Sequence, residues 1–540
     1  LQGEALMREA ERLAFESVGN VTLLHLTDLH AQLGPVHYRE PPVNIGTGDD
    51  AGRPPHLVGQ DFLQYYGLRP GSPEAYALGA DDFVALAQTY GRMGGIDRIA
   101  RVVRAIRSER EGKVLLLDGG DTWQGSYTSL KSRAADMVEV MGALGPDAMT
   151  AHWEFTYGTK RVREIVKQLP YAFLGGNIFD ADWNEPAFPA MKVFECGGVK
   201  IAVIGQAFPY LPVANPKWMF PKLAFGLREG QLRKNVATAR AKGAQLVVVL
   251  SHNGFDVDRK LATRVEGIDV ILAGHTHDAL PEPVRVGRTL VVASGSHGKF
   301  VSRLDLDVGK TGVRAFRYRL IPIFADVIAP DADMAGLVGK VRAPFTTALG
   351  EELGRAEALL YRRGTFNGTF DDLICGALLA EQEAEIALSP GFRWGTAVLP
   401  GHAITREDIY NATAITYPEV YRVEMTGERL KQVLEDVADN IFNPDPYYRQ
   451  GGDMVRAGGL AYRIDVGARA GARISDLRLL RTGEAIEASK SYVVAGWASV
   501  NQAVKGPPIW DVVERYVRAR STVAIQPNRS VTVTGSDPGQ

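Results

Sequence analysis

Acidic and histidine side chains gather directly after short apolar stretches in the N-terminal three-fifths of the chain. Five such stretches are each followed by a loop of small residues that carries a carboxylate or an imidazole. The ligand-type residues in these loops are Asp28, His30, Asp121, His152, His252, His275 and His277. Imidazole nitrogens and carboxylate oxygens bind divalent transition metals, so the pattern predicts a metal centre.

Seven donors suffice for two metal ions that share one ligand. Two neighbouring divalent cations repel each other, and a carboxylate can bridge them because it has two oxygens. We expect Asp121, on the turn after Gly119 and Gly120, to be that bridge. One metal would then be completed by Asp28, His30 and His277, and the other by His152, His252 and His275, with an open position for a shared water. Alternate residues of an extended segment point to the same side, so Asp28/His30 and His275/His277 could each serve one metal or two.

A structural role is the competing interpretation for each of these residues taken singly. A lone histidine at a strand end is more often structural than a ligand, and the prediction depends on five loops carrying donors together. We expect His25, inside an apolar stretch, to be a satisfied core residue. His297, in a Ser-Gly-Ser-His-Gly loop, either approaches the cleft or is structural. Asp118 and Asp278 would cap loops or orient a ligand histidine through its other nitrogen.

The donor loops meet only if their strands are neighbours in one α/β architecture. Short apolar runs alternate with helical segments, which favours parallel pairing. The predicted strands are Val21–Leu26, Val114–Leu117, Ala148–Thr150, Ala172–Leu174, Ile201–Ile204, Leu246–Leu250 and Val270–Ala273. In an open α/β sheet the loops at the carboxyl ends of the strands form the binding crevice. Hairpins over Lys192–Ala207 and Phe300–Pro322 indicate a second or mixed sheet.

The length of 540 residues predicts two or three domains. We expect a short helical extension over residues 1–17, a metal-binding α/β domain over 18–325, a linker helix over 326–353 and an α+β domain over 354–540. Pro35–Asp81, rich in Pro, Gly and Asp, is predicted to be a long insertion or loop.

Composition excludes several classes of protein. A net charge of −2 provides no basic field for nucleic acid or an anionic membrane surface. No apolar run approaches the roughly 20 residues of a membrane-spanning helix. Two cysteines, Cys196 and Cys375, exclude a disulfide framework and a thiolate-rich metal site. Because the sequence begins with Leu1, we expect that a preceding segment is missing, either a cleaved signal peptide or residues beyond an expression boundary.

The donor motifs as a set resemble a known enzyme family. Asp28-x-His30, Gly119-Gly120-Asp121, Ser251-His252 and Gly274-His275-x-His277 are similar to the motifs of dinuclear metallophosphoesterases of the 5′-nucleotidase type. The resemblance covers nearly the whole chain. It implies a four-layer catalytic domain, with two central mixed sheets flanked by helices, joined by a linker helix to a C-terminal substrate-binding domain.

Two segments depart from the nucleotidase pattern and resemble a particular branch of the family. Nucleotidases carry Asn-His-Glu where this chain has His152-Trp153-Glu154, and residues 495–501 replace their base-clamping segment. The string 152–158, with Gly451–Met454 and Gly458-Gly459, resembles the SoxB sulfate thiohydrolases of the bacterial Sox sulfur-oxidation system. This resemblance implies two manganese ions, a periplasmic location, the SoxYZ carrier protein as partner and its cysteine S-thiosulfonate as substrate. A 5′-nucleotidase or related phosphoesterase is the alternative.

The residues agree with that chemistry. A sulfonate sulfur is tetrahedral and bears oxygens, so a metal-bridging hydroxide could attack it and release sulfate. A persulfide leaves readily as an anion, which makes the family's proton-donating histidine dispensable and accounts for Trp153. Arg393, aligned with a substrate-facing nucleotidase Arg, is predicted to clamp the oxyanion, with a structural role as the alternative. Asn177 either lines the same cleft or holds a tight turn.

Overall fold

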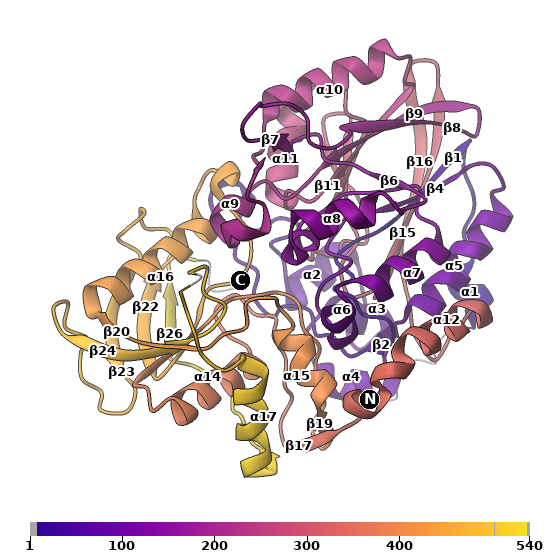
Figure 1. Ribbon diagram of the computed structural model, residues 1–540. Coiled ribbons are helices and arrows are strands. Elements are labelled where there is room, and N and C mark those ends of the chain that lie inside the picture. Colours follow the sequence, from indigo (N-terminus) through magenta and orange to yellow (C-terminus); the bar gives the residue numbers. More distant parts are fainter. Residues whose placement is uncertain (1–7, 502, 537–540) are drawn as a thin grey trace. The chain divides into compact units, whose positions relative to one another are not determined.

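The computed structural model describes residues 8–501 and 503–536 and divides into two compact units (Figure 1). Unit 1 is built from the described residues up to Val36, from Gly71–Leu78 and from Gln88–Pro344. Unit 2 is built from His37–Pro70, from Gly79–Ala87 and from Phe345 to the last described residue. Residues 1–7 of the predicted N-terminal extension lie outside the described residues, and the remainder of it contains α1 (Glu9–Leu13).

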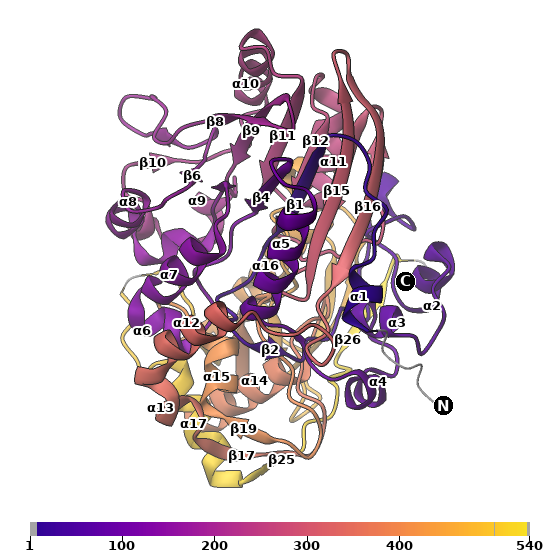
Figure 2. The ribbon, with the colours of Figure 1, turned by 90° about the vertical axis from the view of Figure 1, so that its right-hand side faces the viewer.

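The first sheet of unit 1 has the strand order β16-β15-β1-β4-β5-β6. Its strands are β1 (Val21–Leu26), β4 (Val114–Asp118), β5 (Ala148–Met149), β6 (Ala172–Phe173), β15 (Phe300–Gly309) and β16 (Gly312–Pro322). β1, β4, β5 and β6 are parallel, whereas the β15–β16 hairpin adds antiparallel strands beside β1 (Figure 2). The parallel strands bring the loops after β1, β4 and β5 to one edge.

The second sheet has the order β13-β14-β12-β11-β9-β8. Its strands are β8 (Met191–Cys196), β9 (Val199–Gln206), β11 (Leu246–Ser251), β12 (Val270–Ala273), β13 (Val284–Val286) and β14 (Thr289–Ala293). β9, β11, β12 and β14 are parallel, and β8 and β13 are antiparallel edge strands. The predicted α/β class with two mixed sheets is therefore confirmed.

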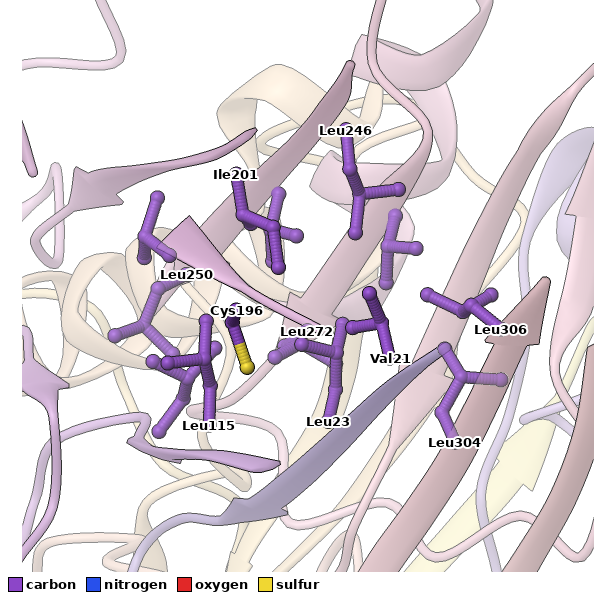
Figure 3. Packing of buried hydrophobic residues seen from close by; sticks show 14 of the residues in the cluster. Val21, Leu23, Leu115, Cys196, Ile201, Leu246, Leu250, Leu272, Leu304 and Leu306 are labelled. Atoms are coloured by element: carbon purple, nitrogen blue, oxygen red, sulfur yellow. The ribbon is translucent and has the colours of Figure 1, made fainter. Parts of the chain in front are cut away.

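A single apolar core joins the two sheets. Val21 and Leu23 of β1 and Leu115 of β4 pack in one cluster with Leu250 of β11 and Leu272 of β12 (Figure 3). These side chains are almost completely removed from solvent. Each buried aliphatic side chain of this size stabilises the fold by about 1.5–3 kcal/mol relative to an exposed one. The core therefore fixes the relative positions of the strand ends that carry the donor loops.

Helices of unit 1 connect the parallel strands. They are α5 (Ile96–Glu109), α6 (Tyr127–Ser132), α7 (Ala135–Leu144), α8 (Thr159–Val166), α10 (Glu229–Ala241) and α11 (Phe255–Arg264), and α12 (Ala332–Arg342) follows the last strand of the unit, β16. The stretch 326–353, expected to be a linker helix, contains α12 and the short α13 (Thr346–Leu349). Among the described residues, no helix is long and apolar enough to span a membrane.

Unit 2 mixes helices with three small sheets, in agreement with the predicted α+β class. The sheets have the orders β19-β17-β25, β20-β24-β18-β21 and β23-β22-β26. The strands are β17 (Glu352–Ala356), β18 (Ile386–Ser389), β19 (Ala403–Thr405), β20 (Tyr421–Thr426), β21 (Arg456–Gly458), β22 (Leu460–Asp465), β23 (Ile474–Leu479), β24 (Ser491–Gly496), β25 (Thr522–Val523) and β26 (Val531–Thr534). The principal helices are α14 (Thr369–Glu381), α15 (Arg406–Thr413), α16 (Gly427–Phe442) and α17 (Ile509–Arg520).

Much of the segment predicted as an insertion belongs to unit 2, although it precedes most of unit 1 in the sequence. It contains α2 (Gly59–Tyr66) and is held by a buried ion pair in which Arg449 Nη1 lies 2.7 Å from Asp50 Oδ2. Arg449 also donates hydrogen bonds to the backbone oxygens of Thr47 and Pro444. Residues 37–70 of the insertion are thus an ordered part of the second unit, whereas Gly71–Leu78 belong to unit 1.

Candidate metal centre

The seven predicted donor residues lie together in unit 1 and form two groups that share one carboxylate. Within each group the donor atoms all lie within 4.8 Å of one another. The first group contains Asp28, His30, Asp121 and His277, and the second contains Asp121, His152, His252 and His275. All seven are buried except His275, which is partly exposed. Asp121 belongs to both groups, which is the position that a ligand bridging two metal ions would occupy.

Left-handed backbone conformations aim these side chains into the groups. The φ angles are 54° at Asp28, 46° at His30, 55° at Asp121, 77° at His275 and 60° at His277. A non-glycine residue in such a conformation costs about 1–3 kcal/mol and persists only where its surroundings hold it. The bends also separate His275 from His277, which enter different groups although they are alternate residues. The simple side-chain alternation of an extended segment therefore does not apply at this loop.

Backbone carbonyls orient two of the imidazoles. Nδ1 of His252 lies 2.6 Å from the oxygen of Gly119, and Nδ1 of His30 lies 3.2 Å from the oxygen of Gln124. With Nδ1 donating, Nε2 of each ring is left as a donor atom for a metal. Nε2 of His252 lies 2.9 Å from Asp121 Oδ2, and Nε2 of His30 lies 3.0 Å from Nε2 of His277. These nitrogens thus converge within the two groups.

Glu154 joins the two loops that carry Asp121 and His152. Its buried carboxylate accepts four backbone N–H hydrogen bonds of 2.8–3.1 Å. Oε1 accepts from Asp121 and His152, and Oε2 accepts from Thr122 and Trp123. One side chain therefore fixes the spacing of the shared carboxylate and of a second-group imidazole.

The electrostatics of the groups suit a cation. Although burial alone would raise it, the neighbouring imidazoles of His152 and His252 hold the pKa of Asp121 well below its usual value. Burial and the Asp121 charge raise the pKa of Asp28. Burial lowers the pKa of His30 to about 4. Oδ1 of Asp28 is buried and accepts no hydrogen bond from the described residues. A buried carboxylate oxygen of this kind is costly unless a cation compensates it, so the residues present fit a metal.

Trp153 and Asn177 take different positions relative to these groups. The backbone N–H of Trp153 donates to Asp121 Oδ1 at 2.8 Å, which places Trp153 directly beside the shared carboxylate. The buried amide of Asn177 donates to the oxygens of Ala207 and Gly226 and accepts from the N–H of Ala207. Asn177 therefore joins two loops of unit 1 and lies in neither donor group.

His297 and His25 lie close behind the donor groups. The His297 ring centroid is 5.6 Å from those of both His30 and His277. The backbone N–H of His297 donates to the backbone oxygen of Asp28 at 2.9 Å. His297 is thus adjacent to the first group, although it is outside the donor set. His25 is fully buried, as expected of a core residue, and its Nδ1 is hydrogen-bonded to Ser294 Oγ at 2.6 Å. Its Nε2 has no hydrogen-bond partner among the described residues, so the ring is satisfied on one side only.

Arg393 belongs to a buried cluster of charges in unit 2. Its Nε donates to Asp453 Oδ1 at 3.0 Å, and its Nη2 donates to the oxygen of Gly452 at 2.9 Å. Arg362, Arg363 and Arg456 are also buried around Asp453 and a second carboxylate, Asp371. Four guanidinium groups against the carboxyl groups of Asp371, Asp453 and the neighbouring Asp372 leave an excess of positive charge, which suits an oxyanion. Sequence reasoning identified Arg393 alone, although the adjacent pair Arg362-Arg363 was a visible signal.

Comparisons with known proteins agree with this geometry. Residues 352–512 match the model of the 5′-nucleotidase C-terminal domain. The snake venom 5′-nucleotidase of Gloydius brevicauda is 25% identical over 435 residues, which cover 72% of this chain and 71% of the relative. The 5′-nucleotidase precursor of Thermus thermophilus has the same fold, with a TM-score of 0.75 at 20% identity over 96% of this chain and 100% of that one.

A more similar structure is the Thermus thermophilus sulfate thiohydrolase SoxB in complex with glycerol. It superposes with a TM-score of 0.94 and 38% identity over 97% of this chain and 98% of that chain. Likeness of this extent covers both units. The chain therefore belongs to the SoxB sulfate thiohydrolase family within the 5′-nucleotidase superfamily.

Proposed function

We propose that this protein is a dimanganese sulfate thiohydrolase that removes the terminal sulfonate from a cysteine S-thiosulfonate on a SoxYZ carrier and releases sulfate. The observation that carries the proposal is the 38% identity to a SoxB sulfate thiohydrolase over nearly the whole chain. Two donor groups that share Asp121 support it, because hydrolases of tetrahedral oxyanions commonly use a pair of metals. The proposal places the enzyme in the bacterial periplasm.

The proposed ligands follow the two groups. Asp28, His30 and His277 would hold one ion, His152, His252 and His275 the other, and Asp121 would bridge them. Bound metals would supply Lewis acidity toward sulfonate oxygens and activate a water for attack. Five imidazoles and two carboxylates accept several divalent metals, and the proposal of manganese rests on the resemblance to SoxB.

Side chains of the protein would position the donor loops, bind the sulfonate and surround the leaving group. Asp121 and Glu154 keep the two donor loops at a fixed spacing. Arg393 would bind sulfonate oxygens, and Asp453 presents its guanidinium in a defined orientation. A persulfide is a stable anion and departs without a proton donor. Trp153 therefore serves at the position where nucleotidases use a histidine, and its indole would exclude water from the leaving group.

A carrier assay tests the proposal. Purified protein is loaded with Mn²⁺ and mixed with a carrier bearing cysteine S-thiosulfonate, and sulfate is measured by ion chromatography. We expect sulfate release that depends on metal and is lost in Asp121→Asn. Asp307→Asn, at a partly exposed residue paired with Arg314, is the matched control and should be active. Absence of sulfate above the metal-free reaction would refute the proposal.

A phosphoesterase activity is the second candidate. It is favoured by the 5′-nucleotidase C-terminal domain match over residues 352–512 and by the 25% identical venom nucleotidase. The same preparations with AMP as substrate distinguish the two activities. Phosphate release faster than sulfate release would make this candidate the better description of the protein.

A further inference from the structure

His152 lacks the backbone carbonyl contact that orients His30 and His252. Its Nδ1 lies 3.3 Å from Asp121 Oδ2, so this nitrogen faces the second donor group. Neither ring nitrogen is hydrogen-bonded to any residue of the described chain. Metal-bound histidines are normally oriented by a hydrogen bond from the second nitrogen, as the Gly119 oxygen provides for His252. Another interaction must therefore set the angle of the His152 ring.

Phe208 stacks on the imidazole of His152. The two ring centroids are 3.9 Å apart and the planes are inclined by 33°. The same phenyl ring lies 4.3 Å from the centroid of His275, also at 33°. Phe208 is 1% exposed, so its ring has little freedom to move. The ring of His252, the third imidazole of the second group, is farther from Phe208, at 6.4 Å between centroids and 90° between planes. One aromatic side chain thus packs closely against two imidazoles and lies edge-on to the third.

The backbone around Phe208 is tied to the donor loops. Its N–H donates to the oxygen of Ala151, the residue before His152, at 3.0 Å. The preceding residue, Ala207, is bonded through both its N–H and its oxygen to the side chain of Asn177. The position of the phenyl ring is therefore set by the same loop that carries His152 and by a buried amide.

We propose that Phe208 is a positioning residue for the second metal, because its ring packs against those of His152 and His275 and holds them in their binding orientation. The inference rests on the proposed metal-ligand role of His152. Phe208 belongs to the segment that follows β9, so this loop would support this side of the centre.

Manganese binding to the full-length protein tests the role of Phe208. The number and affinity of bound Mn²⁺ ions are measured by titration with detection of free Mn²⁺ by electron paramagnetic resonance, and the spectrum of the coupled pair is recorded. We expect Phe208→Leu to weaken the second ion by about 10- to 100-fold, the usual effect of removing a group that orients a ligand. Phe208→Tyr, which keeps the ring, should retain near-normal affinity and the pair spectrum. Phe220→Leu changes another buried phenylalanine that packs on Phe225, and it should have no effect on binding.

A double-mutant cycle identifies the residue through which Phe208 acts. In a His152→Asn background the oxygen ligand remains but the ring is absent, so Phe208→Leu should cause a smaller loss than in the natural chain. Fully additive losses, or unchanged Mn²⁺ binding in Phe208→Leu, would overturn the proposal.

The test also separates this inference from the proposed function. His152→Ala is measured in the same titration. If His152→Ala removes the second ion while Phe208→Leu binds normally, only the positioning role fails. If His152→Ala binds two ions with normal affinity, the ligand assignment itself fails, and the positioning role fails with it.

Discussion

Individual side chains of the donor groups occupy positions that are unfavourable in isolation. Asp28 and Asp121 are both buried, and five donor residues have left-handed backbone angles. Burial lowers the pKa of His252, but the two carboxylates more than reverse this and raise it to about 10. Without a metal, a proton on His252 would therefore compensate part of the buried negative charge. A divalent cation would replace that proton and satisfy more donors at once.

Arg393 is the side chain whose removal should affect the substrate and leave the metals in place. We expect Arg393→Ala to lower kcat/KM for sulfate release by about 10- to 100-fold, since a hydrogen bond to a charged group contributes about 1.5–3 kcal/mol. Steady-state kinetics with loaded carrier and elemental analysis of the variant provide the measurement. Arg422→Ala, an exposed arginine of the same unit, is the control. Normal kcat/KM in Arg393→Ala would exclude the residue as the anion clamp.

Asp258 gives a pH-dependent contribution to stability. Burial raises its pKa to about 7, although Asn253 and Ser251 donate hydrogen bonds to it. Between about pH 4 and 7 the folded chain keeps a proton that the unfolded chain has lost, so this residue lowers the free energy of unfolding as pH rises. In Asp258→Asn that decline should be absent. Melting temperatures of both proteins from pH 5 to 8 provide the comparison, and parallel pH profiles would contradict the assignment.

The loops after β4 and β5 act as one element because Glu154 binds both. In Glu154→Gln an amide NH₂ would face two backbone N–H groups, leaving buried donors unpaired at a cost of about 1–3 kcal/mol each. The spacing between Asp121 and His152 should then relax, and we expect Mn²⁺ affinity to fall at least tenfold. Isothermal titration calorimetry measures the change. Glu164→Gln, on the surface of α8, should bind normally, and equal affinities in the two variants would argue against the cross-link.

Strands were predictable from sequence because each is a short apolar run that ends in small or polar residues. The predicted Val21–Leu26 and Val270–Ala273 coincide with β1 and β12, and the other five strands differ by a few terminal residues. The distribution of His275 and His277 between the groups could not be predicted. It depends on backbone bends that the packed loop imposes, whereas sequence patterns report only the regular alternation of an extended chain.

The assignment of residues to the two units was harder to predict from the sequence than the positions of the strands. Arg363 and Asp453 lie 90 positions apart in sequence, and only the folding of unit 2 brings Arg363 Nε to 3.7 Å from Asp453 Oδ2. Likewise, residues 37–70 and 79–87 join unit 2 through contacts such as Arg449–Asp50. The local composition indicated an insertion, but it contained no information about which unit the insertion packs against. Long-range ion pairs of this kind require the tertiary structure.

Metal binding should stabilise the molecule unevenly, because all seven candidate ligands lie in unit 1. A ligand that binds the folded state alone stabilises it by about 1.4 kcal/mol for each tenfold excess over its Kd. Calorimetry of the full chain should therefore show that Mn²⁺ raises the melting transition of unit 1 and that a chelator reverses the rise. The transition of unit 2, which has its own apolar core, should move much less. Asp121→Asn should abolish the shift, because the shared carboxylate serves both groups. An equal Mn²⁺ shift in Asp121→Asn would mean that the stabilising ions bind elsewhere.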